Sequence, residues 1–342
     1  MSPSKSVLKV AIAATALTAL GLVAATPAAA HTNNMYTYVE YSFDEPTTSG
    51  FATYGKTDGV ATKLATPLIY DEGLEVLGIE VAGEKGTVLG YVAETFFVET
   101  WNHTTGEPSG VPMSVANPGA DNVLGYTGLD TLNDGTTVTL SDFEVLGGEF
   151  VSRFWAVGSL NSGTGEYIPL VDLTPALTIE GEIVYAVLSL ATEPATGITY
   201  VFLQNESEES FYLAVDVAAN TVGAPTLFQT DDMEDGAING ADFDPADGSL
   251  YLNYDNEDEE EYQLLKFGAP ATWATADPTF ISQAPSNDSI IAQLALTIEY
   301  TALAATGSEL PIVAWVLVGT VAVLAGGVTV MVARRRAEAG TV

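Results

Sequence analysis

Glycine-ended turns, each followed directly by an apolar strand, divide much of this chain into units of similar length. The turn glycines are Gly86, Gly135, Gly197 and Gly248, and successive ones are 49, 62 and 51 residues apart. Glycine is favoured there because tight hairpin turns need a residue with positive φ. The last two units also match beyond the turn, since Tyr200 corresponds to Tyr251. The repeat predicts a fold in which one small sheet is used several times.

The segments between these turns have the patterns of β-strands. From Ile290 to Tyr300, apolar and other residues alternate with a period of two, as expected for a strand with one buried face. Val184–Leu190 and Ile198–Leu203 are continuous apolar runs, which indicate strands buried on both faces. Because almost no helical period occurs between residues 31 and 302, we expect this part of the chain to be all-β.

Units of about 50 residues, each with roughly four short strands, resemble the blades of a β-propeller. The hairpin Gly240–Tyr251, which contains the pattern aromatic-Asp-Pro-x-x-Gly-x-Leu-Tyr, is similar to the first hairpin of many bacterial propeller blades. Four glycine-turn units leave Ile290–Tyr300 without partners later in the chain. Three N-terminal strands supply them and complete a fifth blade: Met35–Phe43, Phe51–Gly55 and Val60–Tyr70. The resemblance implies a ligand site at the mouth of the central channel.

A second architecture explains the same strands. Two β-sandwich domains in tandem, joined near Leu173–Glu182, would also give many short strands separated by turns. The five-bladed propeller and the tandem sandwiches are therefore the two folds expected for residues 31–302.

The N-terminal segment has the three parts of an export signal. Lys5 and Lys9 form a charged region, Val10–Ala25 is apolar, and Ala28 and Ala30 occupy the small-residue positions of a cleavage site. This order is typical of a secretory signal peptide covering residues 1–30, so we expect the mature chain to begin at His31.

The C-terminal segment carries a second localisation signal. Residues 312–333 contain no charged residue, and as a helix they would extend roughly 33 Å, enough to cross a bilayer. The tail 334–342 begins with three basic residues, Arg334, Arg335 and Arg336, which would hold the C-terminal end of the helix in the cytoplasm. A pentapeptide, residues 303–307, precedes the apolar run, and it consists of Leu303, Ala304, Ala305, Thr306 and Gly307.

This order of pentapeptide, membrane helix and basic tail resembles the cell-wall sorting signal of Gram-positive surface proteins. Ala304 stands where the usual motif has proline, which is the form associated with sortases of high-GC actinobacteria. The resemblance implies that sortase cuts between Thr306 and Gly307 and joins the Thr306 carboxyl to peptidoglycan. It therefore implies a protein at the cell surface, either anchored to the wall or held in the membrane by one helix.

Charge and cysteine content exclude several classes of function. Between His31 and Thr306 there are 43 acidic and five basic residues, a net charge of −38, and the chain has no cysteine. Such a surface repels nucleic acid, and the lack of cysteine excludes thiolate metal sites and thiol catalysis. Acidic loops at 231–236 and 255–261 leave calcium binding as a hypothesis; no other cofactor is expected.

Two functions fit these observations. The first is a surface protein whose ectodomain binds an extracellular ligand or forms part of the envelope, without catalysis. The second is a wall-anchored extracellular hydrolase, similar to the glycosidases that use a propeller and paired carboxylates. A hydrolase would place two or three carboxylates on one face of the central channel, with a raised pKa on one of them. A binding module would place aromatic side chains or bare acidic rims there instead.

Overall fold

The computed structural model describes the following residues: 35–41, 50–57, 61–64, 75–83, 85–117, 120, 122–147, 150–179, 182–183, 185–228, 233, 236–256, 261–273, 278–284 and 289–296. All of them belong to one compact unit, Asn33–Val342. The predicted signal peptide, sorting motif and membrane helix lie outside the described residues. Within the described part of the chain, no helix is long and apolar enough to span a membrane.

Five antiparallel sheets of four or five strands make up most of the described structure, and we call them blades 1 to 5. Blade 1 contains β4 (Glu75–Ala82), β5 (Lys85–Val92), β6 (Thr95–Asn102) and β7 (Met113–Ser114), and blade 2 contains β8 (Asn122–Thr131), β9 (Thr137–Gly147), β10 (Phe150–Leu160) and β11 (Tyr167–Asp172). Blade 3 contains β14 (Tyr185–Thr192), β15 (Thr199–Asn205), β16 (Ser210–Asp216), β17 (Thr221–Val222) and β18 (Thr226–Leu227), and blade 4 contains β19 (Gly236–Phe243), β20 (Leu250–Asn256), β21 (Glu261–Phe267) and β22 (Thr279–Ala284). Blade 5 contains β23 (Ser289–Leu296), β1 (Met35–Tyr41), β2 (Gly50–Tyr54) and β3 (Ala61–Lys63).

Short elements connect some of these sheets. A one-turn helix α2 (Thr174–Leu177) and the two-stranded sheet of β12 (Thr178–Ile179) and β13 (Glu182–Ile183) follow blade 2. A 3₁₀ turn η1 (Pro270–Thr272) follows β21. The region near Leu173–Glu182 therefore joins two blades and does not separate two sandwich domains.

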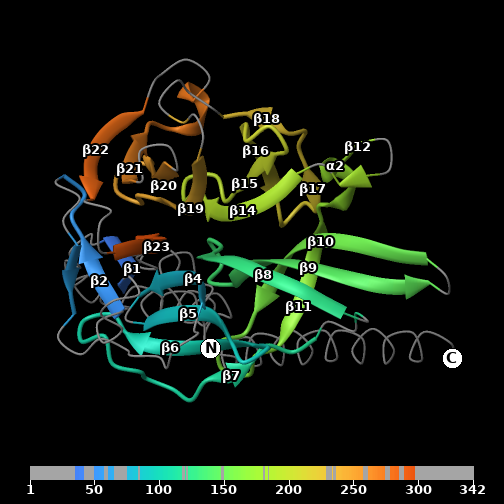
Figure 1. The fold of residues 1–342 in the computed structure, drawn as a ribbon, viewed down its shortest axis with the longest axis horizontal. Coiled ribbons are helices and arrows are strands. Elements are labelled where there is room, and N and C mark those ends of the chain that lie inside the picture. The colour runs from blue at the N-terminus through green and yellow to red at the C-terminus, as the bar shows by residue number, and fades with distance from the viewer. Residues whose placement is uncertain are drawn as a thin grey trace, which may run out of the picture. The chain divides into compact units, whose positions relative to one another are not determined.

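The first strands of the five sheets form a closed ring. Each of β4, β8, β14, β19 and β23 contacts the corresponding strand of the blade on either side, and β23 contacts β4 to complete the circle. Figure 1 shows these strands gathered at the centre, with the later strands of each sheet farther out. The fold is a five-bladed β-propeller, which confirms the first prediction and makes the tandem-sandwich alternative wrong.

Blade 5 closes the ring with strands from both ends of the described chain. Strand β23 pairs antiparallel with β1, and the register places Met35 opposite Leu296. Strand β1 pairs in turn with β2, and β2 with β3. The predicted fifth blade of one C-terminal and three N-terminal strands is confirmed, so neither strand is left with an open edge at this joint.

The predicted role of the turn glycines is confirmed at three positions and wrong at one. Gly135, Gly197 and Gly248 have φ of 88°, 73° and 72° in the turns after the first strands of blades 2, 3 and 4. In blade 1 the positive φ, 61°, belongs to Gly83. Gly86 instead lies within β5, where an added Cβ would be 2.0 Å from Cε2 of Trp101. Glycine is required there because the Trp101 ring packs directly on the strand.

Buried apolar side chains fill the space between every pair of neighbouring blades. There are five such clusters, one at each contact between blades. One residue from each cluster serves as an example: Val81 between blades 5 and 1, Leu129 between blades 1 and 2, Leu190 between blades 2 and 3, Phe243 between blades 3 and 4, and Leu296 between blades 4 and 5. Because each sheet buries its two faces against different neighbours, the stability of one blade depends on both.

Candidate functional site

Acidic side chains occupy equivalent positions on three of the five inner strands. Glu80 on β4, Asp130 on β8 and Asp242 on β19 each follow a β-bulge near the end of the strand. Their side chains are 1%, 1% and 2% exposed. By register, the same position holds Ala191 in β14 and Ala295 in β23. The ring of inner strands thus contains three buried carboxyl groups.

The two aspartates join neighbouring blades through backbone hydrogen bonds. Oδ1 of Asp130 accepts a hydrogen bond from the N–H of Thr131 in its own blade (2.6 Å), and Oδ2 accepts one from the N–H of Thr192 in blade 3. In the same way, Asp242 accepts hydrogen bonds from the N–H groups of Phe243 (2.7 Å) and of Leu296 in blade 5. Each carboxylate therefore satisfies two buried donors that lie on different sheets.

Glu80 lies at the same position in blade 1 but has no such bonds. Neither of its carboxyl oxygens has a hydrogen-bond partner of ordinary geometry among the described residues. The Thr131 hydroxyl and the Val81 N–H lie near enough to favour the charged form. Burial outweighs them and raises the pKa of Glu80 well above its usual value, and the charges of Asp130 and Asp242 raise it further.

The two aspartates also have raised pKa values. Burial raises the pKa of Asp130 to about 7, although its hydrogen bonds to Thr192 and Thr131 act in the opposite direction. Burial likewise raises the pKa of Asp242 above its usual value; Asp130 adds to the increase, while Leu296, Phe243 and Lys56 oppose it. The cluster can therefore hold protons at a pH where exposed carboxyl groups are ionised.

This cluster has only some of the features expected of a hydrolase. Three carboxyl groups do lie around the propeller axis with raised pKa values, as a catalytic set would. All three are buried from solvent, however, and Asp130 and Asp242 are each bonded to two backbone N–H groups. Catalysis requires that an acid or base reach the substrate. The geometry fits the joining of blades better than it fits hydrolysis.

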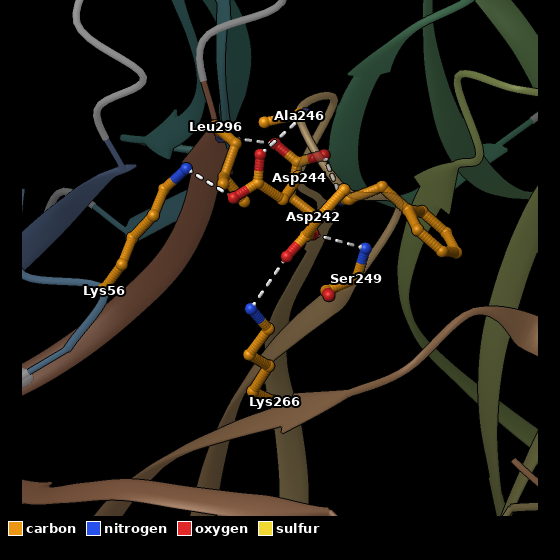
Figure 2. Close-up of polar contacts among 9 residues, drawn as sticks. Lys56, Asp242, Asp244, Ala246, Ser249, Lys266 and Leu296 are labelled. Carbon is orange, nitrogen blue, oxygen red and sulfur yellow. Dashed lines mark hydrogen bonds and ion pairs between the residues drawn. The ribbon is translucent and has the colours of Figure 1, made fainter. Parts of the chain in front are cut away.

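The turn next to Asp242 gathers two of the five basic residues of the ectodomain. Lys56, from the β2–β3 connection, contacts Oδ2 of Asp244 at 2.7 Å, and Lys266 contacts Oδ2 of Asp247 at 3.0 Å. Figure 2 shows both lysines directed at this hairpin, Lys56 from the left and Lys266 from below. The Lys56 pair is largely buried, with side chains 16% and 6% exposed, and it joins blade 5 to blade 4. The Lys56 pair therefore contributes to ring closure, whereas Lys266 and Asp247 both lie within blade 4.

A cavity lies where blades 2 and 3 meet, away from the acidic cluster. Its volume is about 330 Å³. It is lined by Arg153 and Trp155 from β10, Ile183 from β13, Tyr185 to Val187 at the start of β14, and Gln204 to Glu206 at the end of β15 and directly after it. This volume is at the lower end of the range for small-ligand sites, about 300–1,000 Å³. The cavity is a candidate binding site.

Arg153 is the only arginine between residues 31 and 306, and Asp142 holds its side chain in place. Nε of Arg153 donates to both carboxylate oxygens of Asp142, at 2.9 and 3.1 Å, and Nη2 donates to one of them. The guanidinium lies 5.8 Å from the centre of the Trp155 ring. The hydrogen bond with Asp142 raises the pKa of Arg153, so the group is charged at any ordinary pH.

The residues singled out from the sequence are mostly outside the described part of the chain. This holds for the cleavage site at Ala28, Ala30 and His31, for the motif Leu303–Gly307 and for Arg334–Arg336. Of the acidic loops, the structure describes Met233 and Gly236 in one and Asp255 and Asn256 in the other, followed by Glu261. Within the described ranges, no group of three or more His, Asp or Glu residues is arranged to hold a metal ion. Calcium binding stays a prediction.

Sequence reasoning did not identify Glu80, Asp130 or Asp242. Among 45 acidic residues in the whole chain, three carboxyl groups do not stand out by number. Their flanking residues were the available signal, because each follows an apolar residue close to the end of a strand, as in Ile79-Glu80-Val81 and Leu129-Asp130-Thr131. A lone acid inside an apolar strand indicates a buried carboxyl group.

No protein-family model and no curated protein matches the sequence. Solved structures similar to this chain include a protein of unknown function from Dyadobacter fermentans, with TM-score 0.47 and 10% identity over 74% of this chain and 84% of that one. A gluconolactonase from Xanthomonas campestris has TM-score 0.40 and 12% identity, over 73% and 77% of the two chains. The extracellular domain of a hybrid two-component system from B. thetaiotaomicron has TM-score 0.35 and 11% identity, and the match covers 75% of this chain but only 27% of that one. The propeller assignment rests on this chain's own sheet order and closure.

Proposed function

We propose that this chain is an exported surface protein that sortase anchors to the cell wall, and that its propeller is a binding module without catalytic activity. Sortase, peptidoglycan and an extracellular ligand are the proposed partners, and the membrane is contacted through one helix. The observation that carries the binding assignment is the position of the carboxyl groups. The three carboxyl groups on the inner strands, those of Glu80, Asp130 and Asp242, are buried, whereas an open cavity lined by Arg153 lies between blades 2 and 3.

The anchoring part of the proposal rests on the order of signals in the sequence. A secretory signal at residues 1–30, the motif Leu303–Gly307, an apolar run at 312–333 and the Arg334–Arg336 stop occur in the order that wall sorting requires. In a wall fraction, mass spectrometry is expected to find a peptide that ends at Thr306 and is joined to peptidoglycan. Thr306→Ala should abolish this product, and Thr301→Ala, just outside the motif, should not. Recovery of the wild-type chain only as the intact protein in detergent would contradict the proposal.

A wall-anchored hydrolase is the second candidate, and the raised pKa values of Glu80 and Asp130 are the observation in its favour. The two candidates differ in their response to Glu80→Gln. This change removes the acid of the cluster that does not bond a backbone N–H of the next blade, as Asp130 and Asp242 do. We expect no release of reducing ends from polysaccharides by the wild-type protein. Turnover that Glu80→Gln abolishes, in a variant that still unfolds cooperatively, would favour the hydrolase.

A further inference from the structure

We propose that the cavity between blades 2 and 3 binds an uncharged oligosaccharide, with Arg153 and Glu206 contacting its hydroxyl groups. This inference rests on the proposed binding function and adds to it the site and the chemical class of the ligand.

Arg153 provides the hydrogen-bond donors. Asp142 occupies its Nε–H and one N–H of Nη2, so the other N–H groups, including both on Nη1, are available along one edge of the planar group. Asp142 is buried, with its side chain 6% exposed, while that of Arg153 is 48% exposed. The guanidinium is thus fixed at its base and open at its edge, which lowers the conformational entropy lost when a ligand binds.

Gln204 and Glu206 provide the acceptors. Nε2 of Gln204 donates to the backbone oxygen of Gly236 at 2.8 Å, which fixes the amide and leaves its oxygen as the acceptor. Glu206 is exposed at the rim of the cavity. A sugar hydroxyl both donates and accepts, so neighbouring hydroxyls can be bonded by a donor on one side and acceptors on the other. The arrangement of Arg153 opposite an amide and a carboxylate suits such a pair.

Aromatic rings form part of the cavity wall. Trp155 is 9% exposed, and its backbone N–H donates to Oγ1 of Thr174 at 3.0 Å, which holds the residue in position. Its indole N–H has no acceptor among the described residues, although a buried Trp N–H usually has one. Tyr185 packs edge-on against Phe211, with ring centres 5.3 Å apart. The accessible parts of these rings offer apolar surface to the C–H faces of a sugar.

Charge argues against ionic ligands. The ectodomain carries 43 acidic and five basic residues, so an anionic ligand would be repelled over the whole surface. Arg153 does not reverse this locally, because Asp142 pairs with it and Glu144 lies close enough to influence its pKa. A cationic ligand such as an ammonium group carries only hydrogen-bond donors, so it could not accept from the N–H groups of Arg153. A polyhydroxyl ligand without charge meets neither obstacle.

The test uses the full chain, purified in a detergent without a sugar head group. Chitotetraose, cellotetraose, maltotetraose and mannotetraose are the uncharged probes, with tetragalacturonate as the anionic and tetralysine as the cationic comparison, all measured by calorimetry. We expect at least one uncharged probe to bind and both ionic probes to fail. Arg153→Lys should weaken that binding about tenfold and Glu206→Gln about threefold to tenfold, as for one lost hydrogen bond to a charged group.

Glu166→Gln is the matched control for Glu206→Gln. Glu166 is exposed and lines a different cavity of about 380 Å³ in blade 2, so its change should leave affinity within about twofold. Thermal unfolding of each variant shows whether the fold is kept. Wild-type affinity in Arg153→Lys and Glu206→Gln would overturn the assigned site while leaving the binding function in place. Failure of every uncharged probe would overturn the ligand class. The binding function itself fails only if the wild-type chain also retains no envelope component in a pull-down.

Discussion

Two contacts between blades have an acidic residue at the same position of the inner strand: blade 4 against blade 5, and blade 1 against blade 2. The hydrogen bonding of the carboxyl group differs between them. Asp242 accepts hydrogen bonds from its own strand and from the next blade. Glu80 is equally buried and accepts none of ordinary geometry. Glutamate is longer by one methylene, so its carboxyl group is displaced from the position at which aspartate meets both N–H groups. A carboxyl group at this position therefore satisfies two buried backbone donors in one contact and lacks a partner of ordinary geometry in the other.

Removing β23, the strand whose Leu296 N–H donates a hydrogen bond to Asp242, should have the largest effect. Deletion of Ser289–Leu296 takes away the partner of β1 and opens the ring between blades 4 and 1. Because every blade packs on two neighbours, we expect the loss of the cooperative thermal transition of the whole domain. Calorimetry on the full chain measures this. A deletion variant that keeps the wild-type transition would show that the ring is not the cooperative unit.

Weakening the two aspartate contacts should cost less but remain easy to measure. Asp242→Asn and Asp130→Asn each replace one acceptor oxygen with an NH₂ group that faces a backbone N–H. We expect each to lower the free energy of unfolding by about 2 kcal/mol, as for a buried donor left unpaired. Asp134→Asn is the control, because Asp134 bonds Thr136 in an exposed turn and should cost less than about 1 kcal/mol. Equal losses at all three positions would contradict the special role of the inner strands.

The pH dependence of stability should reflect all three acids together. A raised pKa means that the folded protein binds more protons than the unfolded chain, so stability is highest in mild acid. It should fall as the pH rises from about 4 towards the folded pKa of Asp130, about 7. We expect the melting temperature to decrease by a few degrees between pH 5 and pH 8. Measurement in 1 M salt, where the Debye length is about 3 Å, separates this from surface repulsion. A melting temperature that rises over this range would contradict the prediction.

Glu80→Gln should have the smallest effect, and one of opposite sign. The amide keeps the shape of the protonated acid and cannot ionise, so the variant should be more stable than the wild type at pH 8 by about 1 kcal/mol. At pH 4, close to the ordinary pKa of a glutamate, the difference should be small, because little free energy is then needed to protonate Glu80. Urea unfolding at both pH values measures the difference, with the exposed Glu166→Gln as control. Destabilisation at pH 8 would mean that Glu80 joins the blades as the aspartates do.

The sequence was sufficient to predict the repeat, the strands and the closure of the ring. The alternation of apolar and other residues before residue 300 indicated β23. The three predicted N-terminal strands, which had no other sheet to join, indicated its partners in blade 5. The misplaced turn glycine of blade 1 shows where local patterns fail: Gly86 resembles the other turn glycines, but its small size is required by Trp101, 15 positions later in the chain. Only the folded structure shows that contact.

The candidate sites were less predictable, for the same reason. Asp130 and Thr192 are 62 residues apart, and their bond depends on the packing of two blades. Arg153 and Gln204 come from different sheets, and nothing in either strand indicates that they line one cavity. The sequence supplies the composition of these sites, whereas blade packing supplies their geometry.

Closure by β23 and β1 has a consequence for the order of events in synthesis. The first described strand, which begins at Met35, can pair with β2 early, but its partner on the inner side, β23, exists only when residues up to Leu296 have been made. Blades 1 to 4 can assemble as the chain grows, but β1 must wait for almost the whole domain to be made. Until then its edge is free to pair with other extended chains. We therefore expect newly made chains to be most vulnerable to proteases just before the final strand emerges.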